Sequence, residues 1–81
     1  MFQFSLHCLE QLEIRNISQE TIRGVLAASS SEEKTIIEGV TIYQGSIVEN
    51  GKLYLIRVFV NENKTPPLII TAYKTSKINK Y

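Results

Sequence analysis

The dipeptide Asn50-Gly51, which stands between two long apolar runs, constrains the fold of this 81-residue chain more than any other feature. Both residues tolerate the positive φ angles that a two-residue type I′ hairpin turn requires. We therefore predict a strand over 40–49 and a stronger one over 53–60, joined by this turn. The turn would place Glu49 opposite Lys52, as an ion pair at the neck of the hairpin.

Counting from that pair predicts which residues of the two strands lie opposite one another. Tyr43 would face Val58, and Gln44 would face Arg57. The strand over 53–60 is apolar on both faces, which is typical of a central strand, and Arg57 alone interrupts it with a charge. A charge in such a place is costly to bury unless it is paired or partly hydrated. Arg57 therefore either faces solvent or pairs with a Glu, or it lines an anion site on the open face of the sheet.

Before the hairpin, apolar residues recur with the period of a helix. Ser5 and Ser18 are predicted N-caps, each followed by an apolar stripe. Asn16 tolerates the left-handed conformation that closes a helix. We predict a first helix at about residues 6–15 and a second one after Ser18. Gly24, inside the second helix, would allow another element to approach closely.

Two further strands complete the predicted fold. Residues 35–38 are a weak edge strand, and 68–73 form the last strand after a loop that Pro66-Pro67 stiffens. A run of helices followed by a run of strands indicates the α+β class. We predict two N-terminal helices packed on one face of a twisted antiparallel sheet of three to four strands. The length predicts one domain over residues 1–81.

Composition narrows the classes of function. Nine Lys and Arg against eight Asp and Glu give a net charge of +1, without the strong positive charge of many nucleic-acid-binding proteins. No apolar run approaches the roughly 18–20 residues that a membrane span needs, and the first residues lack the pattern of a secretory signal. The single cysteine and single histidine indicate a cytoplasmic protein with no zinc site, and we expect no metal and no cofactor.

The first helix carries a polar stripe beside its apolar one. His7, Gln11 and Arg15 recur four residues apart. His7 would lie in the first turn, where the helix dipole favours neutral imidazole, which can act as a base near pH 7. The simpler interpretation makes His7 a capping or surface residue and Arg15 a solvated cation that complements the dipole. Cys8 is most simply a small buried hydrophobic residue.

The last strand offers a tyrosine. Thr71 and Tyr73 alternate together, and if they share a face with Arg57 they form a polar patch that includes Gln44. Otherwise Tyr73 is an amphipathic residue at the rim of the sheet. The sequence has no Gly-rich phosphate loop, no paired carboxylates and no Ser-His-Asp spacing. A metal-free cleavage of a phosphodiester needs a base, an acid and cations, so the candidate catalytic residues are His7, Arg15, Arg57 and Tyr73.

Two blocks of the sequence resemble a known family. The first has the pattern Phe4-Ser5-x-His7-Cys8-x-Glu10-Gln11-x-x-x-Arg15-Asn16-Ile17-Ser18. It resembles the opening of the small bacterial family called domain of unknown function 4258, F-S-x-H-A-x-E-R-M-x-x-R-G-I-S. The second has the pattern Thr71-Ala72-Tyr73-Lys74-Thr75-Ser76-Lys77-Ile78-x-Lys80-Tyr81. It resembles the last strand and tail of that family, which is itself similar to the RelE/BrnT-like toxins.

The resemblance implies two helices followed by a twisted antiparallel sheet, and it implies a metal-independent endoribonuclease with a small antitoxin protein as partner. His7 and Arg15 match the family's two helix positions, and Tyr73 and Thr75 match its last strand. Gln11 departs from it, because many relatives have Arg there. The departure removes a phosphate-binding cation and favours the alternative, a non-catalytic module that binds RNA or a protein. A structural or oligomerising domain is a third, weaker hypothesis.

The C-terminal segment 74–81 is basic and has no acidic residue. Clustered cations bind phosphates with release of counterions, and an aromatic ring offers a face for base stacking. We predict that this tail carries RNA affinity through Lys74, Thr75, Lys77, Lys80 and Tyr81. The alternative is a solvated C-terminus without such a role.

Overall fold

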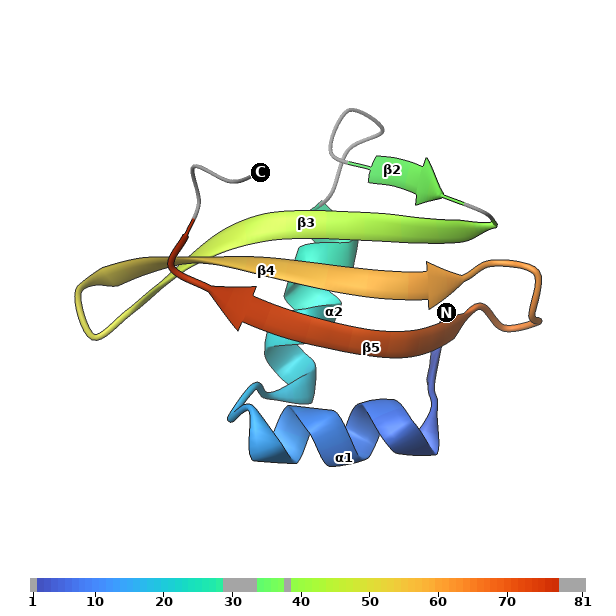
Figure 1. Cartoon of the computed structure of the whole chain (residues 1–81), viewed down its shortest axis with the longest axis horizontal. Helices are drawn as coiled ribbons and strands as arrows, with labels where there is room; N and C mark the ends of the chain where they lie inside the picture. The colour runs from blue at the N-terminus through green and yellow to red at the C-terminus, as the bar shows by residue number, and fades with distance from the viewer. Residues whose placement is uncertain (1, 29–33, 38, 78–81) are drawn as a thin grey trace.

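The structure, a computed structural model, describes residues 2–28, 34–37 and 39–77. Within these ranges the elements are β1 (Gln3–Phe4), α1 (Leu6–Ile14), α2 (Gln19–Ala28), β2 (Lys34–Ile37), β3 (Val40–Glu49), β4 (Lys52–Asn61) and β5 (Leu68–Thr75). The strands form one sheet in the order β1-β5-β4-β3-β2, with β4 at its centre (Figure 1). The predicted α+β class is confirmed, and so is the central position of the strand that is apolar on both faces.

The short strand β1 is absent from the predicted fold. Gln3 and Phe4 pair in parallel with Leu68 and Ile69, and the backbone N–H of Ser5 donates to the carbonyl of Ile69 at 3.0 Å. The sheet is therefore mixed, and the prediction of a purely antiparallel sheet is wrong. The described residues form five strands rather than three or four. Two residues are too few to show a period of two, so periodicity alone does not find this strand.

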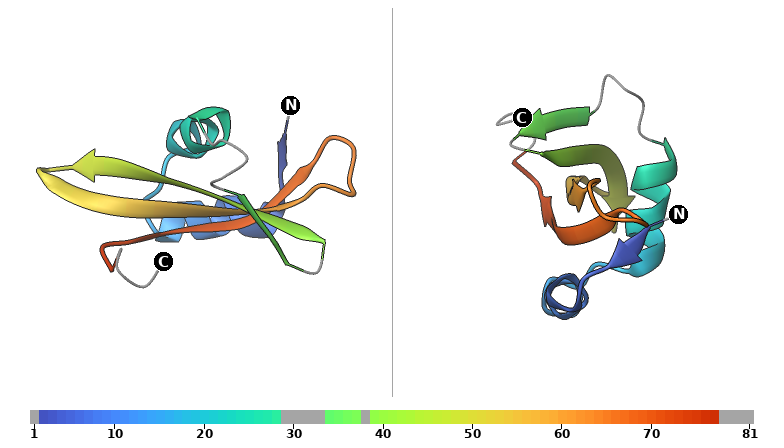
Figure 2. Two further views of the ribbon diagram at one scale, coloured as in Figure 1. Left: turned by 90° about the horizontal axis from the view of Figure 1, so that it is seen from above. Right: turned by 90° about the vertical axis from the view of Figure 1, so that its right-hand side faces the viewer.

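The two helices take different positions on the sheet. α2 crosses one face over β3 and β4, whereas α1 runs alongside β5 (Figures 1 and 2). We call the face that α2 covers the core face and the opposite one the open face. Both helices bury side chains in one core, together with core-face residues of β3, β4 and β5. Its buried members are Cys8, Leu12, Ile17, Ile22, Val25, Leu26, Tyr43, Ile56, Val58, Val60, Ile69 and Ala72.

The hairpin between β3 and β4 has the predicted turn and register. Asn50 has a φ of 52° and Gly51 a φ of 76°, both in the left-handed region that a type I′ turn requires. Glu49 lies opposite Lys52, and the pairing continues to Gln44 opposite Arg57. A short local signal thus fixes the alignment of two ten-residue strands.

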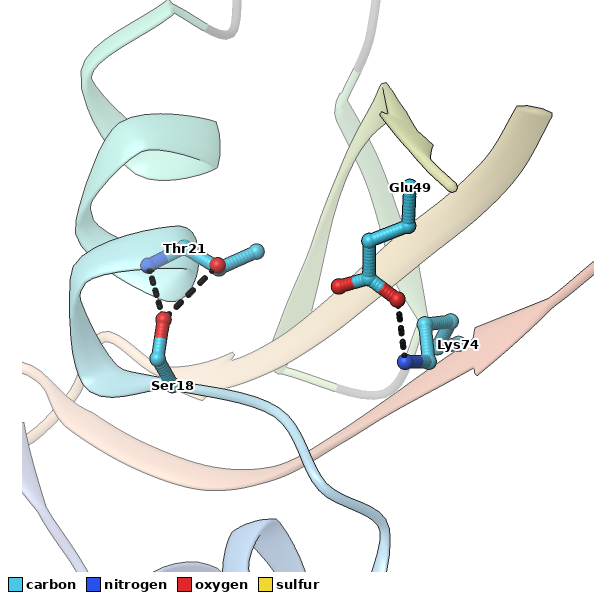
Figure 3. A network of polar contacts seen from close by, with 4 residues as sticks. All are labelled: Ser18, Thr21, Glu49 and Lys74. Atoms are coloured by element: carbon cyan, nitrogen blue, oxygen red, sulfur yellow. Dashed lines mark hydrogen bonds and ion pairs between the residues drawn. The ribbon is translucent and has the colours of Figure 1, made fainter. Parts of the chain in front are cut away.

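The predicted ion pair at the hairpin neck is wrong, although its register is right. The carboxylate of Glu49 pairs with Lys74 of β5, with Nζ and Oε1 2.9 Å apart (Figure 3). The ammonium group of Lys52 instead lies 5.7 Å from the centre of the Tyr54 ring. Lys74 is only 16% exposed, and a less hydrated cation is the better partner because less water competes with the ion pair.

Both helices begin at a serine cap, and α1 has a defined C-terminal cap. The Ser5 hydroxyl accepts a hydrogen bond from the N–H of Cys8 at 2.9 Å, and the Ser18 hydroxyl accepts one from the N–H of Thr21 at 3.1 Å (Figure 3). α1 ends at Ile14, and Asn16, just after the C-cap, has a φ of 56°. The N–H of Ile17 donates to the carbonyl of Leu12, and that of Asn16 donates to Glu13. This pair of bonds is a Schellman motif, and it fixes Arg15 as the C-cap of α1.

The close approach between α2 and the sheet occurs at Gly45 and not at Gly24. A Cβ atom built on Gly45 would lie 3.5 Å from the side chain of Val25, in van der Waals contact. A Cβ atom on Gly24 would meet nothing within 4 Å. The prediction that Gly24 admits a neighbouring element is therefore wrong, and the strand glycine serves that purpose.

The observed bounds of β2 and β5 differ slightly from the predicted ones. β2 begins one residue earlier than predicted and pairs with β3 at the edge of the sheet. β5 continues two residues beyond the predicted end at Tyr73, and its register with β4 changes between Phe59 and Val60. Residues after this bulge keep their direct pairing, so Thr71 lies opposite Phe59 and Tyr73 opposite Arg57.

Candidate functional site

Three strands bring a row of polar residues together on the open face. Gln44 of β3, Arg57 of β4 and Tyr73 of β5 lie directly opposite one another in the register. Nη1 of Arg57 donates a hydrogen bond to the Tyr73 hydroxyl at 3.0 Å. The predicted shared face of Gln44, Arg57, Thr71 and Tyr73 follows from this pairing. Arg57 and Tyr73 are half-buried, so each is partly accessible to a ligand.

Arg15 reaches the same part of the sheet from the end of α1. Its Nη1 donates to the carbonyl of Ala72 at 2.7 Å and contacts the Thr71 hydroxyl at 3.3 Å. Thr71 and Tyr73 are two residues apart on one strand, so their side chains lie on the same face. The interpretation of Arg15 as a solvated helix-end cation is therefore incomplete, because its guanidinium is anchored to β5. The cap of α1 decides this position, since it fixes where the helix ends.

An aromatic pair completes the site, and sequence reasoning missed one of its members. The rings of Phe59 and Tyr73 stack with centroids 5.9 Å apart and planes at 30°. The guanidinium carbon of Arg57 lies 5.9 Å from the centre of the Phe59 ring. Phe59 alternates with Arg57 along β4, and that period of two is the signal that would have found it. We call Arg15, Arg57, Phe59, Thr71 and Tyr73 the Arg-Tyr cluster.

The electrostatic surroundings of the cluster favour an anion. On the open face of the central strands, between Ile42 and Val48, Leu53 and Phe59, and Thr71 and Thr75, none of the described residues is acidic. Two acidic residues at or just after the ends of β3 and β4 make contacts of their own. Glu49 pairs with Lys74 on the core face, and Glu62 accepts hydrogen bonds from Thr41 and Tyr43. The exposed Arg15 and the half-buried Arg57 therefore lie beside two aromatic rings.

His7 lies at the other end of α1 from Arg15. Its side chain is exposed on the first turn, and eight residues of helix separate the two by about 12 Å along the axis. The Ser5 hydroxyl donates to the carbonyl of Ile70 at 3.1 Å, so this end of α1 lies against the start of β5. The structure thus brings Arg15, Arg57 and Tyr73 together and leaves His7 apart from them.

The predicted RNA-binding residues divide between two surfaces. Lys74 belongs to β5 rather than to a tail, and it points to the core face, where it pairs with Glu49 and lies 5.2 Å from the centre of the Tyr54 ring. The Thr75 hydroxyl accepts a hydrogen bond from the N–H of Lys77, whose side chain is exposed. Lys80 and Tyr81 lie outside the described residues.

Two titratable groups in the core have clear structural roles. Burial, with the hydrogen bond that its hydroxyl donates to Glu62 and the charge of that carboxylate, raises the pKa of Tyr43 to about 12. Burial also raises the pKa of the Cys8 thiol, although the positive charge of Arg15 acts in the opposite direction. Cys8 is fully buried, as predicted for a small hydrophobic residue. Neither group belongs to the Arg-Tyr cluster.

The described residues form neither a metal-binding cluster nor a membrane-spanning helix. Over residues 2–28, 34–37 and 39–77, no group of three or more His, Cys, Asp or Glu side chains is placed to hold a metal ion. Neither described helix is long and apolar enough to cross a bilayer.

Comparison with known proteins gives no relative. No protein-family model matches the chain, and neither a curated protein nor a solved structure matches it. The resemblance at residues 4–18 and 71–81 therefore stays a hypothesis, and the function has to be argued from the site.

Proposed function

We propose that this protein acts on RNA through the Arg-Tyr cluster, as a metal-independent endoribonuclease. The observation that carries the proposal is the convergence of Arg15, from the end of α1, and Arg57, from the central strand, beside Thr71 and Tyr73. Two guanidinium groups on one face, where none of the described residues of the central strands is acidic, would form a site for a phosphate group, which arginine binds with its fixed fork of N–H donors.

The aromatic rings give a reason to choose RNA among phosphate compounds. Phe59 and Tyr73 form a stacked pair next to the guanidinium of Arg57. Single-stranded RNA is recognised by bases that stack on aromatic side chains while cations hold the backbone. The cluster has both elements within one patch of the open face. Thr75 and Lys77 follow the cluster along the chain, and the proposal includes Lys80 and Tyr81 on the basis of the sequence.

The proposed cleavage needs no metal. The 2′-hydroxyl of the RNA loses its proton to a water molecule and attacks the adjacent phosphorus, the bond to the 5′-oxygen breaks, and a 2′,3′-cyclic phosphate and a 5′-hydroxyl result. Arg15 and Arg57 would stabilise the charge that develops on the phosphate oxygens. The Tyr73 hydroxyl accepts a hydrogen bond from Arg57, so its own proton points elsewhere, and it would supply the proton that the leaving 5′-oxygen needs.

The position of His7 favours a second candidate function. The sequence contains one histidine, and the structure holds it at the far end of α1 from Arg15. A general base has to come within hydrogen-bond reach of the proton that it takes, and His7 is not placed in this way relative to the cluster. A non-catalytic protein that binds RNA at the same cluster needs no base. In both cases a cytoplasmic location and a small protein partner of the antitoxin kind belong to the proposal.

The experiment is incubation of the purified protein with a mixed pool of single-stranded RNA in the presence of EDTA. The catalytic proposal expects fragments that end in 2′,3′-cyclic phosphate and begin with a 5′-hydroxyl. Tyr73→Phe should slow cleavage by about 10²–10⁴-fold, the usual effect of a general acid, with little change in RNA affinity. Tyr54→Phe is the matched control, because Tyr54 lies on the core face beside Lys74.

The outcomes separate the two candidates. RNA that is bound but not cut, with affinity that falls in Arg57→Gln, would establish the non-catalytic module. Cleavage that persists in Tyr73→Phe would exclude the assigned acid. Protein that neither binds nor cuts RNA would overturn the whole proposal.

A further inference from the structure

A hollow of about 520 Å³ lies between α2 and β1, away from the Arg-Tyr cluster. Five of the residues that line it are apolar and one is a cation: Phe2, Phe4, Leu26, Ala27, Ile69 and Arg23. Its volume is within the range of roughly 300–1,000 Å³ that small-molecule sites occupy. Mainly apolar walls with a single charged group are also typical of such sites.

Arg23 is held at this hollow by two neighbours. Its guanidinium carbon lies 5.4 Å from the centre of the Phe4 ring, and its Nη2 donates to the Gln19 side chain at 3.5 Å. No acidic side chain lines the hollow among the described residues. Among the described residues, the Arg23 guanidinium is thus the one charge that lines the hollow, and a ligand that pairs with it would be an anion.

We infer that this hollow binds a small amphipathic carboxylic acid. The apolar chain of the acid lies between the rings of Phe2 and Phe4 and the side chains of Leu26 and Ala27, and its carboxylate pairs with Arg23. Carboxylates match the planar fork of a guanidinium in two parallel hydrogen bonds. The apolar walls exclude a polyanion such as RNA, whose many charges would find one cation. The site is therefore independent of the proposed RNA surface.

The test is an NMR titration of the whole protein with hexanoate, octanoate and decanoate, each below its critical micelle concentration. Saturable shifts should appear at the backbone amides of Phe4, Arg23 and Ala27. The dissociation constant should fall by about two- to fourfold for each added methylene group until the hollow is full. Octylamine, which has the same chain and the opposite charge, should bind at least about tenfold more weakly.

Two pairs of variants locate the site. Arg23→Gln should weaken octanoate binding by about fivefold or more, whereas Lys64→Gln, which removes the same charge from an exposed position between β4 and β5, should leave it unchanged. Ala27→Trp fills the hollow and should abolish binding. Ala28→Trp places the same bulk one residue later, at a different hollow between α2 and β3, and should not.

Circular dichroism and the dispersion of the amide spectrum show that each variant is folded. Equal affinity for octanoate and octylamine would overturn the assignment to Arg23. Unchanged binding by folded Ala27→Trp, or no saturable shift in the wild-type protein, would overturn the site itself.

Discussion

Residues Tyr73 and Lys74 are neighbours on β5, and they lie on opposite faces of the sheet in opposite electrostatic settings. On the core face, Lys74 is largely buried and its charge is neutralised by Glu49 at 2.9 Å. On the open face, Tyr73 accepts a hydrogen bond from Arg57, and Arg15 binds the strand one residue before it. On the core face Lys74 pairs with an acid, while on the open face Arg57 binds a tyrosine hydroxyl and Arg15 a backbone carbonyl.

The difference shows how a chain with a net charge of +1 can still present a cationic surface. Net charge counts every residue equally, whereas a ligand meets only the charges that are accessible and not already neutralised. Glu49 and Glu62 take part in contacts with Lys74, Thr41 and Tyr43. These two acids thus take part in contacts within the structure, and the guanidinium groups of Arg15 and Arg57 lie together on another face.

The largest effect that separates the two faces should come from truncation of the core. Ile56 is fully buried on the core face, whereas Val48 is 70% exposed on the open face. Ile56→Ala should lower the free energy of unfolding by about 2–5 kcal/mol through lost burial and a cavity. For a chain of this length, that is a large share of the total of about 4–12 kcal/mol. Val48→Ala should cost less than about 0.5 kcal/mol.

Urea unfolding followed by circular dichroism measures both values. Similar losses for the two variants would contradict the difference in burial between these two positions.

A smaller effect is expected at Tyr43, whose hydroxyl donates to Glu62. Tyr43→Phe removes a hydrogen bond to a carboxylate and should destabilise the protein by about 1.5–3 kcal/mol near pH 7. The pKa of Tyr43 is raised to about 12 in the folded protein, above its ordinary value near 10, so the neutral phenol contributes to stability. That contribution is complete below about pH 10 and is lost as the pH rises towards 12.

The free energy of unfolding of the wild type and of Tyr43→Phe, compared between about pH 8 and pH 12, measures this contribution. The difference in stability should be constant up to about pH 10 and then shrink. A difference that grows with pH would mean that the folded state prefers the phenolate.

Substitutions of Gly24 in α2 and Gly45 in β3 by larger residues should change the stability of the protein in opposite directions. Gly45→Leu would force side-chain atoms into Val25, which already lies at van der Waals distance from a Cβ atom, and should cost about 1–3 kcal/mol. Gly24→Ala meets nothing within 4 Å and should stabilise the protein by up to about 1 kcal/mol, because alanine favours a helix. Thermal unfolding compares the two, and destabilisation by Gly24→Ala would place the close contact at α2 after all.

Local signals in the sequence predicted the parts of the fold that short segments determine. Asn50-Gly51 sets the hairpin register, and Ser5 and Asn16 set the ends of α1, because each acts on residues nearby in the chain. The placement of Arg57 opposite Gln44 followed by counting from the turn. The hairpin signal therefore placed one member of the cluster, Arg57, on the sheet.

Other parts depend on contacts between distant segments, which periodicity does not encode. Glu49 finds its partner on a third strand rather than across the hairpin, and Arg15 contacts β5 only because α1 runs alongside it. The parallel strand β1 is too short to show a pattern. The period of two places Phe59 on the same face as Arg57, but its apolar side chain does not by itself indicate that the ring stacks on Tyr73.

The central claim is that the guanidinium groups of the open face, and not the lysine of the core face, hold an RNA phosphate. Its most direct test is the salt dependence of single-stranded RNA binding by the wild type, Arg57→Gln and Lys74→Gln, measured by fluorescence anisotropy. Each phosphate contact to a single strand contributes about −0.7 to the slope of log K against log salt. Arg57→Gln should weaken binding and make the slope less steep by about this amount, whereas Lys74→Gln should change neither. The account would be contradicted if the slope became less steep in Lys74→Gln and stayed the same in Arg57→Gln.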